Sequence, residues 1–182
     1  MPGDWSETAK FRHLTTRYCA GSGVDIGSGG DPVVPWAIQV ELPIQTRQHY
    51  NQGDSHSHFS HHAPVQLEGD GRVLEWFRSM TLDFCYASHL LEDFHVEAWP
   101  DILLEWMRVV KPGGYLVILI PDKVKWAEAL AAGQPPNDAH KHEGTPGELT
   151  GIVSDLASGS WEILRDSLVP DSYTILFVAR RK

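Results

Sequence analysis

The chain has 182 residues, the length of one compact domain, since domains commonly span about 100 to 200 residues. Apolar residues make up 42% and charged residues 21%, a balance that excludes an intrinsically disordered protein. The 24 acidic and 15 basic side chains give a net charge of −9, which repels phosphate backbones and disfavours a nucleic-acid partner.

The first half of the chain contains short strand candidates and one glycine turn. A strand is predicted at Val24–Ile26, running into the turn Gly27–Gly30. Weaker strand candidates follow at Ala37–Leu42 and Pro64–Leu67, and a clearer one at Thr81–Tyr86.

The middle of the chain carries the clearest helix and strand. A helical stretch is expected from about Leu90, and a regular helix over Asp101–Val110, whose apolar residues recur on one helical face. Pro100 stands just before this helix, where a missing N–H group costs no hydrogen bond. The Lys-Pro-Gly-Gly segment Lys111–Gly114 is predicted to end the helix in a turn. The following residues, Tyr115–Ile120, are all apolar, as is typical of a strand buried on both faces of a parallel sheet.

The C-terminal residues predict an antiparallel hairpin. Trp161–Val169 and Tyr173–Arg180 flank the turn cluster Pro170–Ser172. Together these elements predict an α/β fold with a Rossmann-like open sheet, mostly parallel, with an antiparallel C-terminal hairpin and helices on both faces. We expect a single domain over residues 1–182, with an N-terminal segment (1–20) and an α/β core (21–182). Ligands of such sheets bind beyond the carboxyl ends of the strands.

Acidic side chains follow two of the predicted strands. Glu41 ends the second candidate strand, where its two oxygens can accept both hydroxyl groups of a ribose, or can simply be solvated. Asp70, in the turn Glu68–Gly71, can accept from an adenine amino group or belong to a plain surface turn. The glycine turn alone is a weak nucleotide signal, and Pro32 occupies the place where a dinucleotide fingerprint needs a third glycine. An NAD-dependent oxidoreductase is therefore disfavoured.

These features lead, in order, into the run Ser88–Phe94 (Ser-His-Leu-Leu-Glu-Asp-Phe) and the segment Leu104–Ile118, which is followed by Pro121-Asp122. The ordered set resembles the class I S-adenosylmethionine-dependent methyltransferases, most closely the type 11 methyltransferase domain, from roughly Gly23 to the C-terminus. The resemblance implies a seven-stranded sheet with an antiparallel last strand and S-adenosyl-L-methionine as the cofactor. We expect a methyltransferase that acts on a small-molecule or saccharide-like acceptor.

The resemblance also implies which residues hold the cofactor. These are Asp25, Gly27, Ser28, Gly29, Glu41, Asp70, Gly71 and Ser88. Asp25 and the glycine turn would line the methionine part of the cofactor. Glu41 would hold the ribose hydroxyls, and Asp70 with the backbone at Gly71 would meet the adenine. Ser88 would lie beside the sulfonium, with His89 turned toward the acceptor.

One segment departs from the family pattern. Asp31 stands where family members often have another glycine, and only Asp31–Trp36 separates the glycine turn from the next strand. Six residues cannot form a helix of about three turns, so we expect a loop to form this wall of the pocket.

A base is required if the acceptor is a hydroxyl or a protonated amine, but not if it is a free amine or a phenolate. His89, His140 and His142 are the candidates, since imidazole titrates near neutral pH. Each has a structural alternative. His89 can cap the helical stretch that follows it, and His140 and His142 can hold their loop in place. We expect acceptor specificity in the N-terminal segment Met1–Tyr18 and in the loops of Lys123–Gly147.

Four further histidines, His56, His58, His61 and His62, lie within seven residues without a nearby cysteine. A structural zinc site normally takes ligands from two separated elements, so we expect a solvated loop and no metal site. Cys85 is predicted to be a buried hydrophobe rather than a disulfide partner.

We expect a cytoplasmic protein without a membrane partner, because no secretory signal is visible and the longest apolar run is far shorter than the roughly 20 residues of a membrane span. The alternative to an enzyme is a non-catalytic module of the same fold that binds the cofactor or a partner protein, which the short segment after Gly30 permits.

Overall fold

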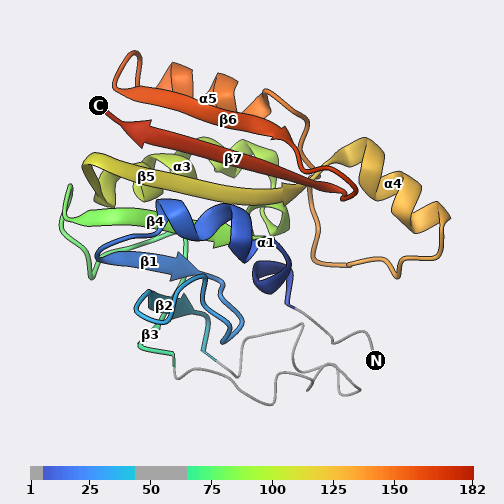
Figure 1. The fold of residues 1–182 in the computed structure, drawn as a ribbon, viewed down its shortest axis with the longest axis horizontal. Helices are drawn as coiled ribbons and strands as arrows, with labels where there is room; N and C mark the ends of the chain where they lie inside the picture. Colours follow the sequence, from blue (N-terminus) through green and yellow to red (C-terminus); the bar gives the residue numbers. More distant parts are fainter. Residues whose placement is uncertain (1–5, 44–64) are drawn as a thin grey trace.

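The computed structural model describes residues 6–43 and 65–182, and His56, His58, His61 and His62 lie outside these residues. The described strands are β1 (Gly23–Ile26), β2 (Ile38–Glu41), β3 (Leu67–Glu68), β4 (Leu82–Ser88), β5 (Val110–Pro121), β6 (Trp161–Leu168) and β7 (Thr174–Arg181). They form one sheet in the order β3-β2-β1-β4-β5-β7-β6 (Figure 1). β1 to β5 are parallel, whereas β7 is antiparallel to both β5 and β6. The predicted fold class is confirmed.

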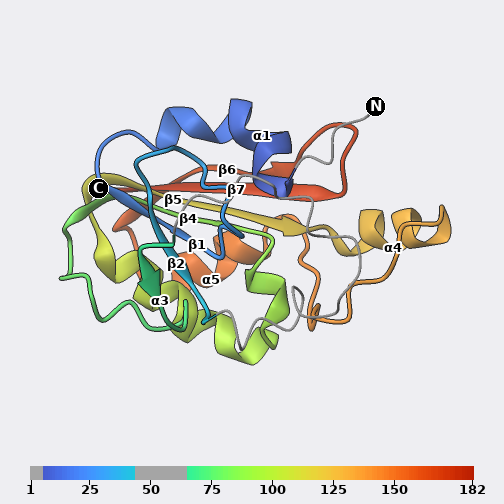
Figure 2. The same cartoon turned by 90° about the horizontal axis from the view of Figure 1, so that it is seen from below.

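Helices cover both faces of this sheet. The α-helices in the described residues are α1 (Glu7–Thr15), α3 (Trp99–Val109), α4 (Lys123–Ala131) and α5 (Glu148–Leu156). Figure 2 shows α1 on one face and α3 and α5 on the other, while α4 projects beyond the end of β5. Among the described residues, no helix has the length and apolar character that crossing a membrane requires.

The apolar core has one part on each face of the sheet. On one side, α3 buries Ile102, Leu103 and Trp106 against β4 and β5. On the other side, Phe11 of α1 packs with Val33 and Val34, which belong to the segment between β1 and β2. That segment has no helix, as predicted, and its two valines contribute the apolar surface that a helix would otherwise supply there.

The chain between α3 and β5 differs from the prediction. α3 ends at Val109, and β5 begins at Val110 without a turn between them. Lys111–Gly114 lies inside β5 as a bulge, because the pairing with β4 changes register at this point. Gly113 has a φ of 83°, in the left-handed region, so its glycine is needed for the bulge rather than for a helix-ending turn.

Two other segments are defined more closely by the structure. The helical stretch predicted from about Leu90 consists of two short 3-10 helices, Leu91–Asp93 and Val96–Ala98, and α3 begins at Trp99. The segment Lys123–Gly147 is not only loop, because it begins with α4. Asp122 caps that helix by accepting a hydrogen bond from the Lys125 N–H at 2.8 Å.

Candidate functional site

Three parallel strands end side by side at one edge of the sheet. Ile26, the last residue of β1, is paired with Ala87 of β4 and Val40 of β2. The residues that follow these three are Gly27, Ser88 and Glu41. The structure therefore brings together three of the residues predicted to hold the cofactor.

Asp70 joins this edge through β3. Glu41 is paired with Glu68, and the Gly69 N–H donates to the Glu41 carbonyl oxygen at 2.8 Å. Asp70 is the next residue along the chain. The two acids predicted to hold the ribose and the adenine therefore follow neighbouring parallel strands at the same edge of the sheet.

Gly71 lets the turn after β3 pack against β1. A Cβ atom at Gly71 would lie 2.4 Å from Cγ2 of Ile26, a distance that no side chain tolerates. The indole Nε1 of Trp106, which is buried in α3, donates to the Gly71 carbonyl oxygen at 2.7 Å. Core packing therefore holds this turn close to the end of β1.

The Asp70 carboxylate is paired with Arg72. Nε of Arg72 donates to both carboxylate oxygens at 3.0 and 2.9 Å, and these hydrogen bonds lower the pKa of Asp70 despite its partial burial. An open hollow of about 280 Å³ lies beside the pair, lined by Asp70, Arg72, Val73, Ala98, Asp101 and Ile102. The glycine turn does not line this hollow, so the hollow is separate from the edge where Gly27 and Glu41 meet.

The Glu41 carboxylate contacts the glycine turn directly. It accepts hydrogen bonds from the Ser28 hydroxyl at 3.1 Å and from the Gly29 N–H. Gly27 and Gly29 have φ values of 70° and 61°, which glycine adopts at little cost. The end of β2 and the turn after β1 therefore form one unit, in which backbone amides lie beside a buried acid.

Asp25 supports the loop behind this turn. Its side chain is fully buried, and Oδ2 accepts a hydrogen bond from the Val33 N–H at 2.6 Å. Burial raises the pKa of Asp25 well above its ordinary value, and the charges of Glu41 and Asp31 add to the effect. Its contact with the methionine part of a cofactor stays a prediction.

His89 lies just after β4 in an unusual backbone conformation, with a φ of 51°. Its Nδ1 is 3.1 Å from Oε1 of Glu92, and its Nε2 is 3.1 Å from Oγ1 of Thr174. Burial alone would lower the pKa of His89, but Glu92 and Glu7 outweigh it and raise the pKa. A left-handed conformation at a non-glycine residue is often found at functional sites.

The other two candidate bases have different surroundings. His140 is buried against Trp126, with ring centroids 5.0 Å apart, and its Nε2 lies 3.8 Å from Oε1 of Glu92. His142 is more exposed, and its Nε2 lies 2.9 Å from Oε1 of Glu148 at the start of α5. His89 and His140 therefore flank one buried carboxylate, whereas His142 bridges its own loop to α5.

Sequence reasoning did not identify Glu92 as the residue between the two histidines. Its side chain is fully buried, and its backbone carbonyl accepts from the N–H groups of Lys141 and His142 at 2.7 and 3.1 Å. The sequence did contain one signal for the contact between Glu92 and His89. Glu92 lies three residues after His89, and residues with this spacing meet on one turn of a helix. Nothing in the sequence indicated that the loop carrying His140 returns to Glu92.

The described residues contain no group of three or more His, Cys, Asp or Glu side chains arranged to hold a metal ion. The four neighbouring histidines of the sequence lie outside the described residues.

One known protein family matches the part of the chain that forms these strand ends. The family described as "Methyltransferase domain" matches residues 24–118, more than half of the chain, from β1 into β5. The chain belongs to the methyltransferase domain family. It is an S-adenosylmethionine-dependent methyltransferase, and the family and cofactor expected from the sequence are confirmed. No curated protein matches this methyltransferase at the sequence level.

Solved structures share the fold of this methyltransferase at low sequence identity. A SAM-dependent methyltransferase from Archaeoglobus fulgidus is 14% identical with a TM-score of 0.66, covering 97% of this chain and 95% of its own. A possible histamine N-methyltransferase from Thermotoga maritima is 15% identical with a TM-score of 0.67, covering 98% and 90%. Magnesium protoporphyrin IX methyltransferase from Synechocystis, solved with bound SAH, is 12% identical with a TM-score of 0.60, covering 96% and 82%.

Proposed function

We propose that this methyltransferase acts on a small-molecule or saccharide-like acceptor, with the cofactor held along the ends of β1 to β4. In this proposal the glycine turn and Asp25 face the methionine part, Glu41 binds the ribose, and Asp70 with Gly71 meets the adenine. Ser88 lies beside the sulfonium. The proposal is supported above all by the alignment of four strand ends, which collects these residues at one edge of the sheet.

The chemistry of the donor groups fits such a cofactor. Gly27 and Gly29 give the turn its left-handed backbone, and the Glu41 carboxylate can accept from two hydroxyl groups. When bound, S-adenosylmethionine supplies an electrophilic methyl group on a positively charged sulfur. The task of the chain is then to align the acceptor and to exclude water from the reacting atoms.

His89 and His140 are the residues proposed to take a proton from a hydroxyl or protonated amine acceptor. His89 directly follows β4. His140 lies in the loop that returns to the end of β5, where Gly144 pairs with Asp122. Glu92 between them stabilises the protonated imidazole of His89. His142 also stays a candidate base, although its contact with Glu148 favours a structural role.

Binding of S-adenosylhomocysteine tests the proposed cofactor site. At a concentration of about 100 times its Kd, the ligand should stabilise the protein by about 2.7 kcal/mol. For a chain of this size, that gain raises Tm by roughly 5 to 10 °C in a thermal-shift experiment. NAD at the same concentration is the control and should leave Tm unchanged. A Tm that responds to NAD alone, or to neither ligand, would contradict the proposal.

The raised pKa of His89 predicts a pH dependence of stability. An unfolded histidine has a pKa near 6.5, and the fold raises the pKa of His89 above this value. Folding therefore favours the protonated form of His89. This contribution to the free energy of unfolding is fully present below about pH 6.5 and is lost as the pH rises through the folded pKa. Each unit of pKa difference corresponds to about 1.4 kcal/mol.

Chemical denaturation of the wild type and His89→Gln between about pH 5.5 and 9 measures this contribution. The stability advantage of the wild type over His89→Gln should be largest at the acidic end and should shrink with rising pH. Glu92→Gln removes the charged partner of His89, so the trend should weaken in that background. A constant difference between the two proteins across the range would show that the fold does not favour protonated His89.

A further inference from the structure

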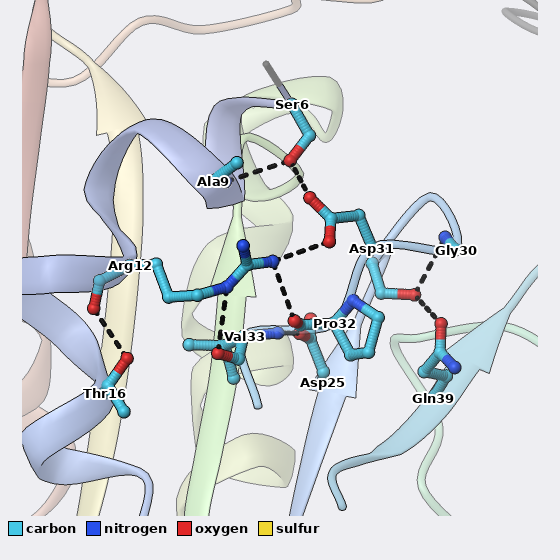
Figure 3. Close-up of polar contacts among 11 residues, drawn as sticks. Ser6, Ala9, Arg12, Thr16, Asp25, Gly30, Asp31, Pro32, Val33 and Gln39 are labelled. Carbon is cyan, nitrogen blue, oxygen red and sulfur yellow. Dashed lines mark hydrogen bonds and ion pairs between the residues drawn. The ribbon is translucent and has the colours of Figure 1, made fainter. Parts of the chain in front are cut away.

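Helix α1 is tied to the loop that follows the glycine turn. Arg12 donates through Nη2 to Oδ1 of Asp31 at 2.6 Å and to the Pro32 carbonyl at 3.1 Å, and through Nε to the Val33 carbonyl at 3.3 Å. Ser6, which caps α1, donates from its hydroxyl to the other oxygen of Asp31. Figure 3 shows these side chains converging on the loop from α1.

The same loop is held from β1 and β2. Asp25 of β1 accepts from the Val33 N–H at 2.6 Å, as Figure 3 also shows. The Ser28 hydroxyl has a single hydrogen to share between Glu41 and the side-chain oxygen of Gln39 in β2, which is 2.8 Å away, and it accepts from the Gly30 N–H at 3.2 Å. The turn and its loop are therefore fastened from three directions, and α1 provides the only one of these that comes from outside the sheet.

The loop needs such an attachment because it contains no helix. In a helix after β1, internal hydrogen bonds would hold the backbone beside the glycine turn. Here the Pro32 and Val33 carbonyls are paired with the guanidinium of Arg12 instead. The planar guanidinium reaches Asp31 and both carbonyls at once, and its side chain is only 35% exposed, so solvent weakens these contacts only in part.

We propose that Arg12 and Asp31 form a positioning pair that holds the glycine turn in the conformation required by the methionine half of the cofactor. The inference rests on the proposed function, because that function assigns this half of the cofactor to the turn. Glu41 and Asp70, which are assigned to the adenosine half, are held by β2 and β3 rather than by α1. Because the Glu41 carboxylate also contacts the turn, the pair should affect the methionine half of the cofactor more strongly than the adenosine half.

Two ligands separate the halves. S-adenosylhomocysteine contains both the adenosine and the amino-acid part, whereas 5′-methylthioadenosine contains the adenosine and the sulfur without the amino-acid part. If Arg12→Ala leaves the turn in its competent conformation only about a tenth of the time, the affinity for S-adenosylhomocysteine falls about tenfold. The affinity for 5′-methylthioadenosine should fall clearly less, because strand pairing keeps Glu41 and the start of the Asp70 turn in place without α1.

Isothermal titration calorimetry on the full chain, at a temperature where circular dichroism shows every variant folded, measures both affinities. Arg17→Ala is the matched control, because Arg17 lies just after α1 and stacks on Tyr18 without reaching the loop. Asp31→Asn and Arg12→Lys complete the set, and both should lower S-adenosylhomocysteine affinity less than Arg12→Ala does. They also replace Arg12→Ala in the comparison if that variant does not fold.

The outcomes are distinct. A selective loss of S-adenosylhomocysteine affinity supports the positioning pair. Equal losses for both ligands would indicate a general structural role, and unchanged affinities would show that the turn needs no support from α1; either result overturns the inference while leaving the cofactor site in place. A wild-type protein that binds neither ligand would overturn the proposed site and, with it, this inference.

Discussion

Replacing Glu41 with alanine is expected to lower the affinity for S-adenosylhomocysteine by at least about 100-fold. Hydrogen bonds to a charged carboxylate each contribute about 1.5 to 3 kcal/mol, and the ribose would lose two of them. The substitution also removes the acceptor that faces the Gly29 N–H and the Ser28 hydroxyl, so the glycine turn loses its attachment to β2. Calorimetric titration gives the affinity directly.

Glu68→Ala is the matched control for Glu41→Ala. Glu68 is the pairing partner of Glu41 on β3, but its side chain is exposed. The Glu68→Ala protein should therefore bind S-adenosylhomocysteine with the affinity of the wild type. Equal affinities of Glu41→Ala and Glu68→Ala would mean that the carboxylate at the end of β2 does not hold the ribose.

Replacing Trp106 with alanine is expected to lower the free energy of unfolding by about 3 to 5 kcal/mol, because a fully buried aromatic side chain leaves a cavity in the core. In a chain of this size, a loss of that magnitude lowers Tm by roughly 6 to 20 °C. Trp106→Phe keeps most of the packing and removes the hydrogen bond to the Gly71 carbonyl, so it should cost less, about 1 to 3 kcal/mol.

Chemical denaturation measures these changes, and Trp36→Ala is the control. Trp36 is 57% exposed, so its loss should change stability by no more than about 0.5 kcal/mol. If Trp106→Phe were as stable as the wild type, the hydrogen bond to Gly71 would not contribute to holding the turn after β3.

Most strands and their order along the chain could be predicted because their signals are local. The exception is β3 (Leu67–Glu68), which shares only Leu67 with the candidate Pro64–Leu67. The run Tyr115–Ile120 is apolar at every position, and in the structure β5 pairs with β4 on one side and β7 on the other. The strand ends also follow from local patterns, since Glu41 is the last residue of β2 and Asp70 lies two residues after β3. Their arrangement at one edge then follows from the parallel pairing.

The helices α1, α4 and α5 were not predicted. The sequences of α1 and α4 lack a strong apolar stripe, whereas α5 has one, formed by Leu149, Ile152, Val153 and Leu156. α1 buries Thr8, Phe11 and Thr15, of which only one is a large apolar residue. α4 buries only Trp126. In α5 the apolar spacing was a readable signal, but the helix is short and contains Gly151, which weakens a helix. Tertiary packing stabilises these helices more than their local sequence does.

The sequence by itself determined the sheet, the family and the residues that line the strand ends, because strand burial, turn chemistry and acidic strand termini are all patterns of neighbouring residues. Only the tertiary structure decided which distant side chains meet. Arg12 reaches Asp31 across 19 residues, and the loop at His140 returns to Glu92. Such contacts depend on how helices and loops pack on the sheet, and no local pattern in the chain specifies that packing.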